Sequence, residues 1–124
     1  MKYLVDSDVL INCLKAIESD LSFLEKYYTI SNISLISYGE VLQVSKNKVN
    51  LKDLKLFLSL FEPISIDNKI QEDAVNLLEM FHLSSGLMFF DALIASTAIN
   101  NNLTLVTRNT KHYKNIPSLK IKTP

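Results

Sequence analysis

The stretch Tyr3-Leu4-Val5-Asp6-Ser7-Asp8-Val9-Leu10 decides the fold. Its first three residues are apolar and do not alternate with polar ones, which is typical of a short strand buried on both faces. Apolar residues recur at helical spacing after Asp8, and either Ser7 or Asp8 is expected to cap that helix. Asp6 therefore ends a buried strand just before a helix, where ligand sites lie in parallel α/β sheets. Burial of a charge is costly unless a partner compensates it. The carboxylate of Asp6 therefore either caps the helix or belongs to a binding site.

The composition indicates a globular chain. Its 124 residues are 48% hydrophobic and 21% charged, so we expect one domain over residues 1–124 with a sizeable core. Lysine and arginine number 13, as do aspartate and glutamate, and the formal net charge is zero. A general electrostatic attraction to nucleic acid is therefore excluded. Any such contact needs a local basic patch or a bound cation.

The cysteine content and the hydropathy pattern indicate in which cellular compartment we expect the protein. Cys13 is the only cysteine, which excludes an internal disulfide and a cysteine-rich zinc site and favours a reducing, cytoplasmic environment. Asp6 and Asp8 interrupt the only apolar run near the N-terminus, so we expect no secretory signal. No apolar stretch reaches the roughly 20 residues that span a bilayer. We therefore expect no membrane association.

The rest of the chain alternates between short strands and helices. Further strands are predicted at 33–36, 64–66 and 103–106, with a last edge strand at 119–121. Helices are predicted behind Ser19, behind Ser37, over 51–61 behind Asn50, from Asp67 to about His82, and over 89–100. This alternation predicts a three-layer α/β/α sandwich with a mainly parallel sheet.

Polar residues interrupt the apolar segments at matching places. Asp6, Glu40 and Asp91 each follow a strand or begin a helix, and Thr107 and Asn109 follow the strand at 103–106. Because the carboxyl ends of parallel strands share one edge of the sheet, these side chains are expected to converge. Three carboxylates in one pocket repel each other, and a hard divalent cation, Mg²⁺ or Mn²⁺, relieves that repulsion. Such an ion can activate water and stabilise charge that develops at phosphorus.

Each of these residues also has a simpler interpretation. Asp91 could be a first-turn acid favoured by the helix dipole. Glu40 stands three residues after Ser37, the spacing of a capping box, and Asn109 could be a turn residue. His112 is expected to be a surface or packing histidine, because no second histidine or cysteine stands at zinc spacing. The lysines at 46, 48, 52 and 55 form either a solvated face or, if they border the cleft, a track for phosphates.

Four motifs together resemble the PIN-domain family, most closely the VapC-type toxins of prokaryotic toxin–antitoxin pairs. In family order, they are Leu4-Val5-Asp6-Ser7-Asp8-Val9-Leu10-Ile11, Ile36-Ser37-Tyr38-Gly39-Glu40-Val41, Asp91-Ala92-Leu93-Ile94-Ala95 and Leu105-Val106-Thr107-Arg108-Asn109. The resemblance implies a metal-dependent endoribonuclease on a sheet of about five parallel strands. It also implies a homodimer, a protein antitoxin that docks in the cleft, and a structured RNA substrate, often tRNA.

The resemblance also assigns residues. Asp6, Glu40 and Asp91 match the first, second and third acids of the family. Asn109 falls where many members have a fourth acid, which puts a second metal ion in doubt. Ser7 matches a position at which the family has serine or threonine near the metal site.

The resulting hypothesis is hydrolysis of an RNA phosphodiester that leaves a 5′-phosphate and a 3′-hydroxyl. Asp6 and Asp91 are predicted to hold Mg²⁺ or Mn²⁺, with Glu40 binding directly or through water. The groups predicted to orient the attacking water or the scissile phosphate are Ser7, Thr107 and Asn109. Either Arg108 or Lys111 is predicted to contact the RNA backbone.

Three other functions fit parts of the pattern. A nuclease that cuts DNA or flaps could use the same fold, although the small size leaves no room for an arch that threads a flap. A binding module could retain the acids without catalysis, and metal titration together with growth arrest would separate it from a nuclease. A phospho-acceptor domain is disfavoured, because neither of the strands predicted at 33–36 and 64–66 ends in the required aspartate.

Overall fold

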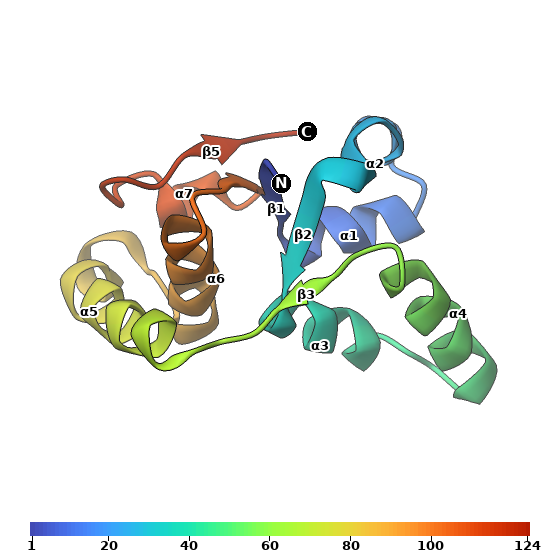
Figure 1. Ribbon diagram of the computed structural model, residues 1–124, viewed down its shortest axis with the longest axis horizontal. Helices are drawn as coiled ribbons and strands as arrows, with labels where there is room; N and C mark the ends of the chain where they lie inside the picture. The colour runs from blue at the N-terminus through green and yellow to red at the C-terminus, as the bar shows by residue number, and fades with distance from the viewer.

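The computed structural model describes all 124 residues and centres on a five-stranded sheet in which every neighbouring pair is parallel (Figure 1). The strand order is β3-β2-β1-β4-β5. The strands are β1 (Tyr3–Val5), β2 (Ser31–Ser34), β3 (Pro63–Ile64), β4 (Thr104–Val106) and β5 (Ile121–Lys122). The first strand of the chain is thus the central one, which explains why it is apolar without alternation. The predicted parallel α/β fold is confirmed.

Helices cover both faces of this sheet. One layer consists of α1 (Ser7–Leu14), α2 (Glu18–Tyr27), α3 (Leu35–Gln43) and α4 (Lys48–Leu58), with the short 3₁₀ helix η1 (Tyr28–Ile30) after α2. The other consists of α5 (Asn68–Ser85), α6 (Phe89–Asn100) and α7 (Thr110–Tyr113). Tyr3 and Val5 pack into the core under the first layer, whereas Leu4 packs into the core under the second. Alternate residues of β1 therefore reach opposite cores. None of the helices combines the length with the apolar character needed to cross a membrane.

Two predicted helix starts are wrong in a way that matters for the site. The helix after β1 is capped by Asp6, whose Oδ1 accepts the N–H of Ser7 at 2.8 Å, and not by Ser7 or Asp8. The helix after β2 is capped by Ser34 instead of Ser37. The strand before it runs over 31–34 instead of 33–36, because its pairing with β1 begins at Ser31. Strand pairing, which local sequence does not contain, thus set both boundaries.

Other boundaries moved for similar reasons. The cap of α2 is Ile17 instead of Ser19, and the cap of α4 is Asn47, whose side chain accepts the N–H of Asn50. β3 and β5 lie at 63–64 and 121–122, each shifted by one or two residues from prediction. Asp67 caps α5 as predicted, but α5 continues past His82 to Ser85 and ends at the left-handed Gly86 (φ 72°). α6 has the predicted bounds, and α7 was not predicted.

Candidate active site

Asp6 lies at the carboxyl end of the central strand and is only 5% exposed. Its Oδ2 accepts a hydrogen bond from the hydroxyl of Thr107 at 2.9 Å, and the hydroxyl of Tyr113 lies 3.4 Å from the same oxygen. Its Oδ1 accepts the N–H of Ser7. Capping and a place in the site are therefore not alternatives, because one oxygen caps α1 while the other faces the site.

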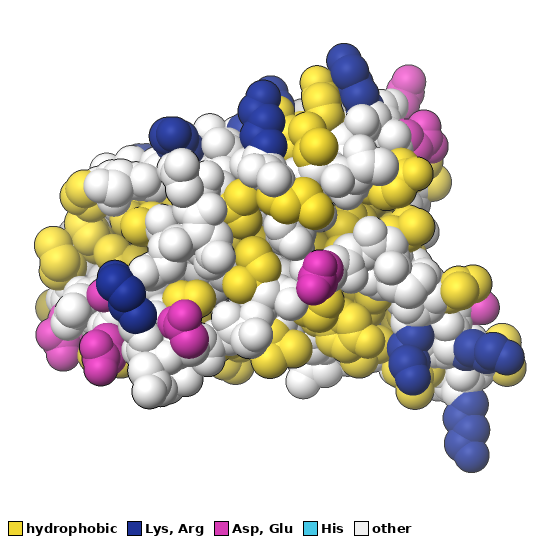
Figure 2. Space-filling model, in the orientation of Figure 1, with side chains coloured by type: hydrophobic (Ala, Val, Ile, Leu, Met, Phe, Trp, Pro, Cys, Tyr) yellow, Lys and Arg dark blue, Asp and Glu magenta, His cyan; other side chains and the backbone are white.

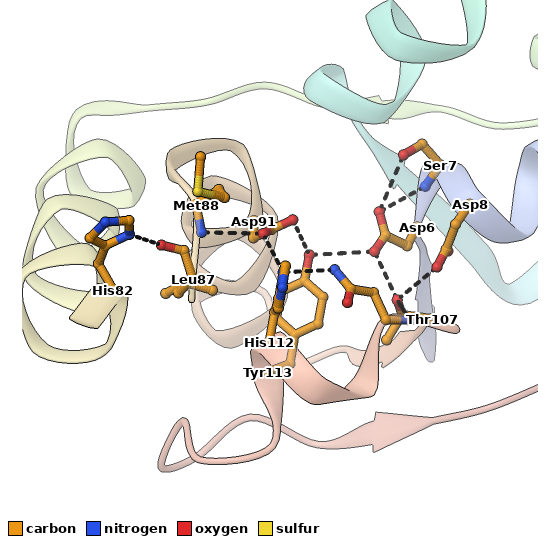
Figure 3. A network of polar contacts seen from close by, with 11 residues as sticks. Asp6, Ser7, Asp8, His82, Leu87, Met88, Asp91, Thr107, His112 and Tyr113 are labelled. Carbon is orange, nitrogen blue, oxygen red and sulfur yellow. Dashed lines mark hydrogen bonds and ion pairs between the residues drawn. The ribbon is translucent and has the colours of Figure 1, made fainter. Parts of the chain in front are cut away.

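Asp91 enters the same site from the first turn of α6 (Figure 3). Its Oδ2 accepts the N–H of Met88 at 3.2 Å and lies 3.1 Å from Nδ1 of His112. Its Oδ1 accepts from the hydroxyl of Tyr113 at 3.3 Å. The simple interpretation of Asp91 as a first-turn acid is therefore incomplete. Figure 3 shows the Tyr113 hydroxyl between the carboxylates of Asp91 and Asp6.

Glu40 joins the site through Ser7. The hydroxyl of Ser7 donates to Oε1 of Glu40 at 3.0 Å and lies 3.5 Å from Oδ1 of Asp6. The capping-box interpretation of Glu40 is wrong, because α3 begins at Leu35 and places Glu40 in its second turn. The hydroxyl of Ser37, the supposed capping partner, is buried and has no hydrogen-bond partner.

The segment after β4 forms the opposite wall. The hydroxyl of Thr107 is buried and reaches Asp6, and it lies 3.3 Å from Oδ2 of Asp8. Asp8 accepts the main-chain N–H of Arg108 at 3.0 Å, so its side chain turns back to this wall instead of serving only α1. The side chain of Asn109 contacts His112 instead of an acid, with its Nδ2 3.1 Å from Nδ1 of His112. His112, expected at the surface or in packing, instead lies beside Asp91.

The two predicted RNA contacts differ in their surroundings. The guanidinium of Arg108 forms an ion pair with Asp20 and donates to the hydroxyl of Ser19. Lys111 is exposed and lines a hollow of about 390 Å³ that contains no hydrophobic residue. The other lining residues are Ser84, Ser85, Gly86, His112, Lys114 and Asn115. Lys111 is therefore the freer of the two cations.

The lysine-rich face lies elsewhere on the molecule. Lys48, Lys52 and Lys55 line a second hollow of about 490 Å³ along α4, and none of the site residues belongs to it. Lysine or arginine side chains project at the lower right of Figure 2, where Figure 1 places α4. Because this hollow shares no residue with the site, the structure favours a solvated face over a phosphate track.

Two residues of this region were missed from the sequence. Tyr113 is completely buried, and its hydroxyl touches both Asp6 and Asp91. Asp20 is also completely buried and holds Arg108. Tyr113 stands within the unpredicted α7, and only a short apolar recurrence of Tyr113 and Ile116 marks that turn in the sequence. Asp20 looks like an ordinary first-turn acid and carries no signal of its own.

Burial controls the electrostatics of the acids. It raises the pKa of Asp6 to about 7, and the charge of Asp8 adds to this, while the hydrogen bonds from Thr107 and Ser7 oppose it. Burial also raises the pKa of Asp8 and, to an extent limited by the Ser7 hydrogen bond, that of Glu40. The site thus holds more negative charge than its own donors compensate. A cation there would favour the ionised carboxylates.

The donor set suits a hard divalent cation, although the acids do not surround a single point. No group of three or more histidine, cysteine, aspartate or glutamate side chains is arranged closely enough to hold a metal ion. The structure brings Asp6 and Asp91 to the same phenol hydroxyl and connects Glu40 through Ser7. Mg²⁺ and Mn²⁺ bind through oxygen, and Mg²⁺ usually takes one or two carboxylates and keeps several waters. Asp6 and Asp91 present two such carboxylates, and Glu40 is connected to Asp6 through the Ser7 hydroxyl.

Comparison with known proteins agrees with this geometry. Residues 3–117 match the model of the PIN domain. The chain is 35% identical to Ribonuclease VapC2 of Rickettsia felis, over 96% of this chain and 95% of that protein. A toxin–antitoxin complex from Klebsiella pneumoniae contains a chain with 32% identity and a TM-score of 0.85, with 99% of this chain and 98% of that chain covered. VapBC2 of Rickettsia felis, solved on a DNA fragment from its promoter, has a chain with 31% identity and a TM-score of 0.80, covering 100% and 99%. The chain therefore belongs to the PIN-domain family.

Proposed function

We propose that this protein is a metal-dependent endoribonuclease and the toxin of a VapBC-type toxin–antitoxin pair. One observation carries the proposal, namely that the carboxylates of Asp6, at the end of the central strand, and Asp91, in the first turn of α6, face the same Tyr113 hydroxyl. The relative Ribonuclease VapC2 supports RNA as the substrate. The resemblance to the PIN-domain family implies a divalent metal ion, and we propose Mg²⁺ or Mn²⁺ for this chain.

Asp6 and Asp91 would hold the ion, and Glu40 would act on it directly or through water. When bound, the ion supplies charge stabilisation at the scissile phosphate and makes a nearby water more acidic. Ser7 orients Glu40 through its hydroxyl, and Thr107 holds Asp6. Asn109 acts on the far side by contacting His112, which lies beside Asp91.

Substrate contact is proposed for the wall formed by α7. Lys111 is exposed on the polar hollow next to His112, where it can meet a phosphate of structured RNA such as tRNA. Arg108 forms an ion pair with Asp20, and we assign it no primary contact with RNA. The reducing setting suggested by a single buried cysteine suits a cytoplasmic enzyme.

Partners follow from the solved relatives. The toxin–antitoxin complexes similar to this chain support a protein antitoxin as the cognate partner. We further propose a homodimer of single nuclease domains, each spanning residues 1–124.

Cleavage-site sequencing of total RNA after brief induction tests the proposal, with wild type compared against Asp91→Ala. Wild type should arrest growth and produce new 5′-phosphate ends, whereas Asp91→Ala should lose about 3–5 kcal/mol of transition-state stabilisation and fall by about 10²–10⁴-fold in rate. The exposed Asp53→Ala is the matched control and should behave like wild type. Purified protein titrated with Mg²⁺ separates a nuclease from a binding module. Cleavage that survives Asp91→Ala in clean protein, or needs no divalent metal, would overturn the assignment.

A further inference from the structure

Asp20, in the first turn of α2, is a completely buried carboxylate with a single cationic partner. Arg108 donates from Nη2 to its Oδ1 and from Nε to its Oδ2, the latter at 3.4 Å. Asn12 donates to Oδ2 at 3.0 Å and Ser19 to Oδ1 at 3.1 Å. Burial alone would raise the pKa of Asp20, but the hydrogen bonds from Arg108, Asn12 and Ser19 together lower it. Asp20 is therefore an ionised group in the fold.

The ion pair joins α1 to the loop of residues 107–109. Arg108 stands between Thr107 and Asn109, and its main-chain N–H donates to Asp8 at 3.0 Å. Asn12 belongs to α1, the helix that Asp6 caps. Asp20 thus binds at once the helix behind Asp6 and the loop in which Thr107 reaches Asp6.

Arg108 is not free to leave this arrangement. Its side chain is 39% exposed, so part of the guanidinium meets solvent. If it swung out toward an RNA phosphate, Asp20 would lose its cation and both hydrogen bonds from the guanidinium, which is unfavourable. The fork of two donors on one carboxylate also restricts its orientation.

We infer that Asp20 and Arg108 form a positioning pair, which holds the 107–109 loop against α1 and acts on turnover instead of RNA binding. The inference rests on the proposed nuclease function. Neither residue touches the reacting groups. Their effect passes through Thr107 to Asp6 and through the main chain of Arg108 to Asp8.

Kinetics of Asp20→Asn, Arg108→Gln and the double variant test this, with total tRNA as the probe at saturating Mg²⁺. Each single variant should lower kcat by about 10- to 100-fold, as expected for a misplaced site, and leave the apparent KM and its salt dependence unchanged. The double variant should be no worse than either single one, because both remove the same interaction. Arg108→Lys, which keeps the charge but not the fork, should recover part of kcat. Lys69→Gln, which breaks the exposed Lys69–Asp73 pair on α5, is the matched control.

Asp20→Asn is the deciding variant, since a completely buried side chain cannot contact RNA. A raised KM and weaker salt dependence in Arg108→Gln, with unchanged kinetics in Asp20→Asn, would make Arg108 an RNA contact and overturn the inference. A wild-type kcat in Asp20→Asn and Arg108→Gln, after correction for the unfolded fraction of each variant, would also overturn the inference.

Hydrogen exchange provides a readout that needs no RNA. The amides of residues 107–109 should exchange faster in Asp20→Asn than in Lys69→Gln, and equal rates would overturn the inference. If wild type cleaves no RNA, the proposed function fails, and the exchange result still decides whether the pair positions the loop.

Discussion

The side-chain hydroxyl of Thr107 donates a hydrogen bond to Oδ2 of Asp6 over 2.9 Å, although 101 positions separate the two residues. They meet because β1 and β4 are parallel neighbours whose carboxyl ends lie together. Burial raises the pKa of Asp6, and this hydrogen bond opposes that rise. The pair therefore influences the pH at which Asp6 becomes a carboxylate that can bind a cation.

Replacing Thr107 with valine removes this donor and keeps the shape of the side chain. The pKa of Asp6 should then rise further above its wild-type value of about 7, by about one unit if the lost bond is worth about 1.4 kcal/mol. Mg²⁺ binding should accordingly require a higher pH, which calorimetric titration over a range around neutrality can measure. An unchanged pH dependence of Mg²⁺ binding would contradict the role given to Thr107.

Asp6→Asn should stabilise the metal-free protein at alkaline pH. The folded-state pKa of Asp6, about 7, exceeds the ordinary value of 3.8. Between pH 3.8 and about pH 7, Asp6 is therefore protonated in the folded state and ionised in the unfolded state. Stability of wild type therefore falls as the pH rises through this window, and the full penalty, up to about 4 kcal/mol, is present above it. Asparagine removes the penalty and still caps α1.

Thermal melts in EDTA at several pH values measure this difference. Asp6→Asn should melt above wild type at alkaline pH. The difference in melting temperature should vanish as the pH falls toward 3.8, the ordinary pKa of aspartate. Added Mg²⁺ should raise the melting temperature of wild type and not that of Asp6→Asn. The exposed Asp53→Asn should follow wild type throughout. A gap that does not vary with pH would show that Asp6 does not carry the penalty.

Tyr113→Phe removes only the hydroxyl that lies between Asp6 and Asp91. Groups that hydrogen-bond to metal-ligating carboxylates orient them, and their loss typically weakens metal binding by about 10- to 100-fold. The contacts of 3.3 and 3.4 Å are long, so we expect the lower end of that range. The Mg²⁺ dependence of the melting temperature measures it, with Tyr27→Phe as the control in the aromatic cluster between α2 and β1. Equal Mg²⁺ affinity in both variants would exclude an orienting role for Tyr113.

Ser37→Ala should stabilise the fold by about 0.5–1.5 kcal/mol, because it removes a buried hydroxyl that has no partner and improves helix propensity. The matched control is Ser96→Ala in α6. Its buried hydroxyl donates to the carbonyl of Ile70 at 2.8 Å, so its loss should destabilise by about 1 kcal/mol. Chemical denaturation gives both free energies of unfolding. Destabilisation by Ser37→Ala would mean that its hydroxyl has a partner in solution.

Much of this protein follows from local patterns in its sequence. The apolar run of Tyr3 to Val5 predicts a strand buried on both faces, and the cap at Asp67 and the bounds of α6 appear as expected. The placing of Asp6 after a strand and of Asp91 at a helix start predicts one shared edge, where both carboxylates contact the Tyr113 hydroxyl. That reasoning works because parallel strands carry their carboxyl ends to the same side.

Tertiary structure alone decided which of several neighbouring residues caps each helix. Asp6, Ser7 and Asp8 can each cap a helix, as can Ser34 and Ser37, and the end of the paired strand selects among them. Tyr113 meets Asp6 across 107 positions and Asp20 meets Arg108 across 88. Periodicity and capping rules extend over only a few residues, whereas these contacts arise when helices from both faces pack around the sheet. The sequence by itself therefore determined the fold class and the shared edge at which Asp6 and Asp91 stand. The packing of α7 determined that Tyr113 lies between them, and the packing of α2 determined that Asp20 binds Arg108.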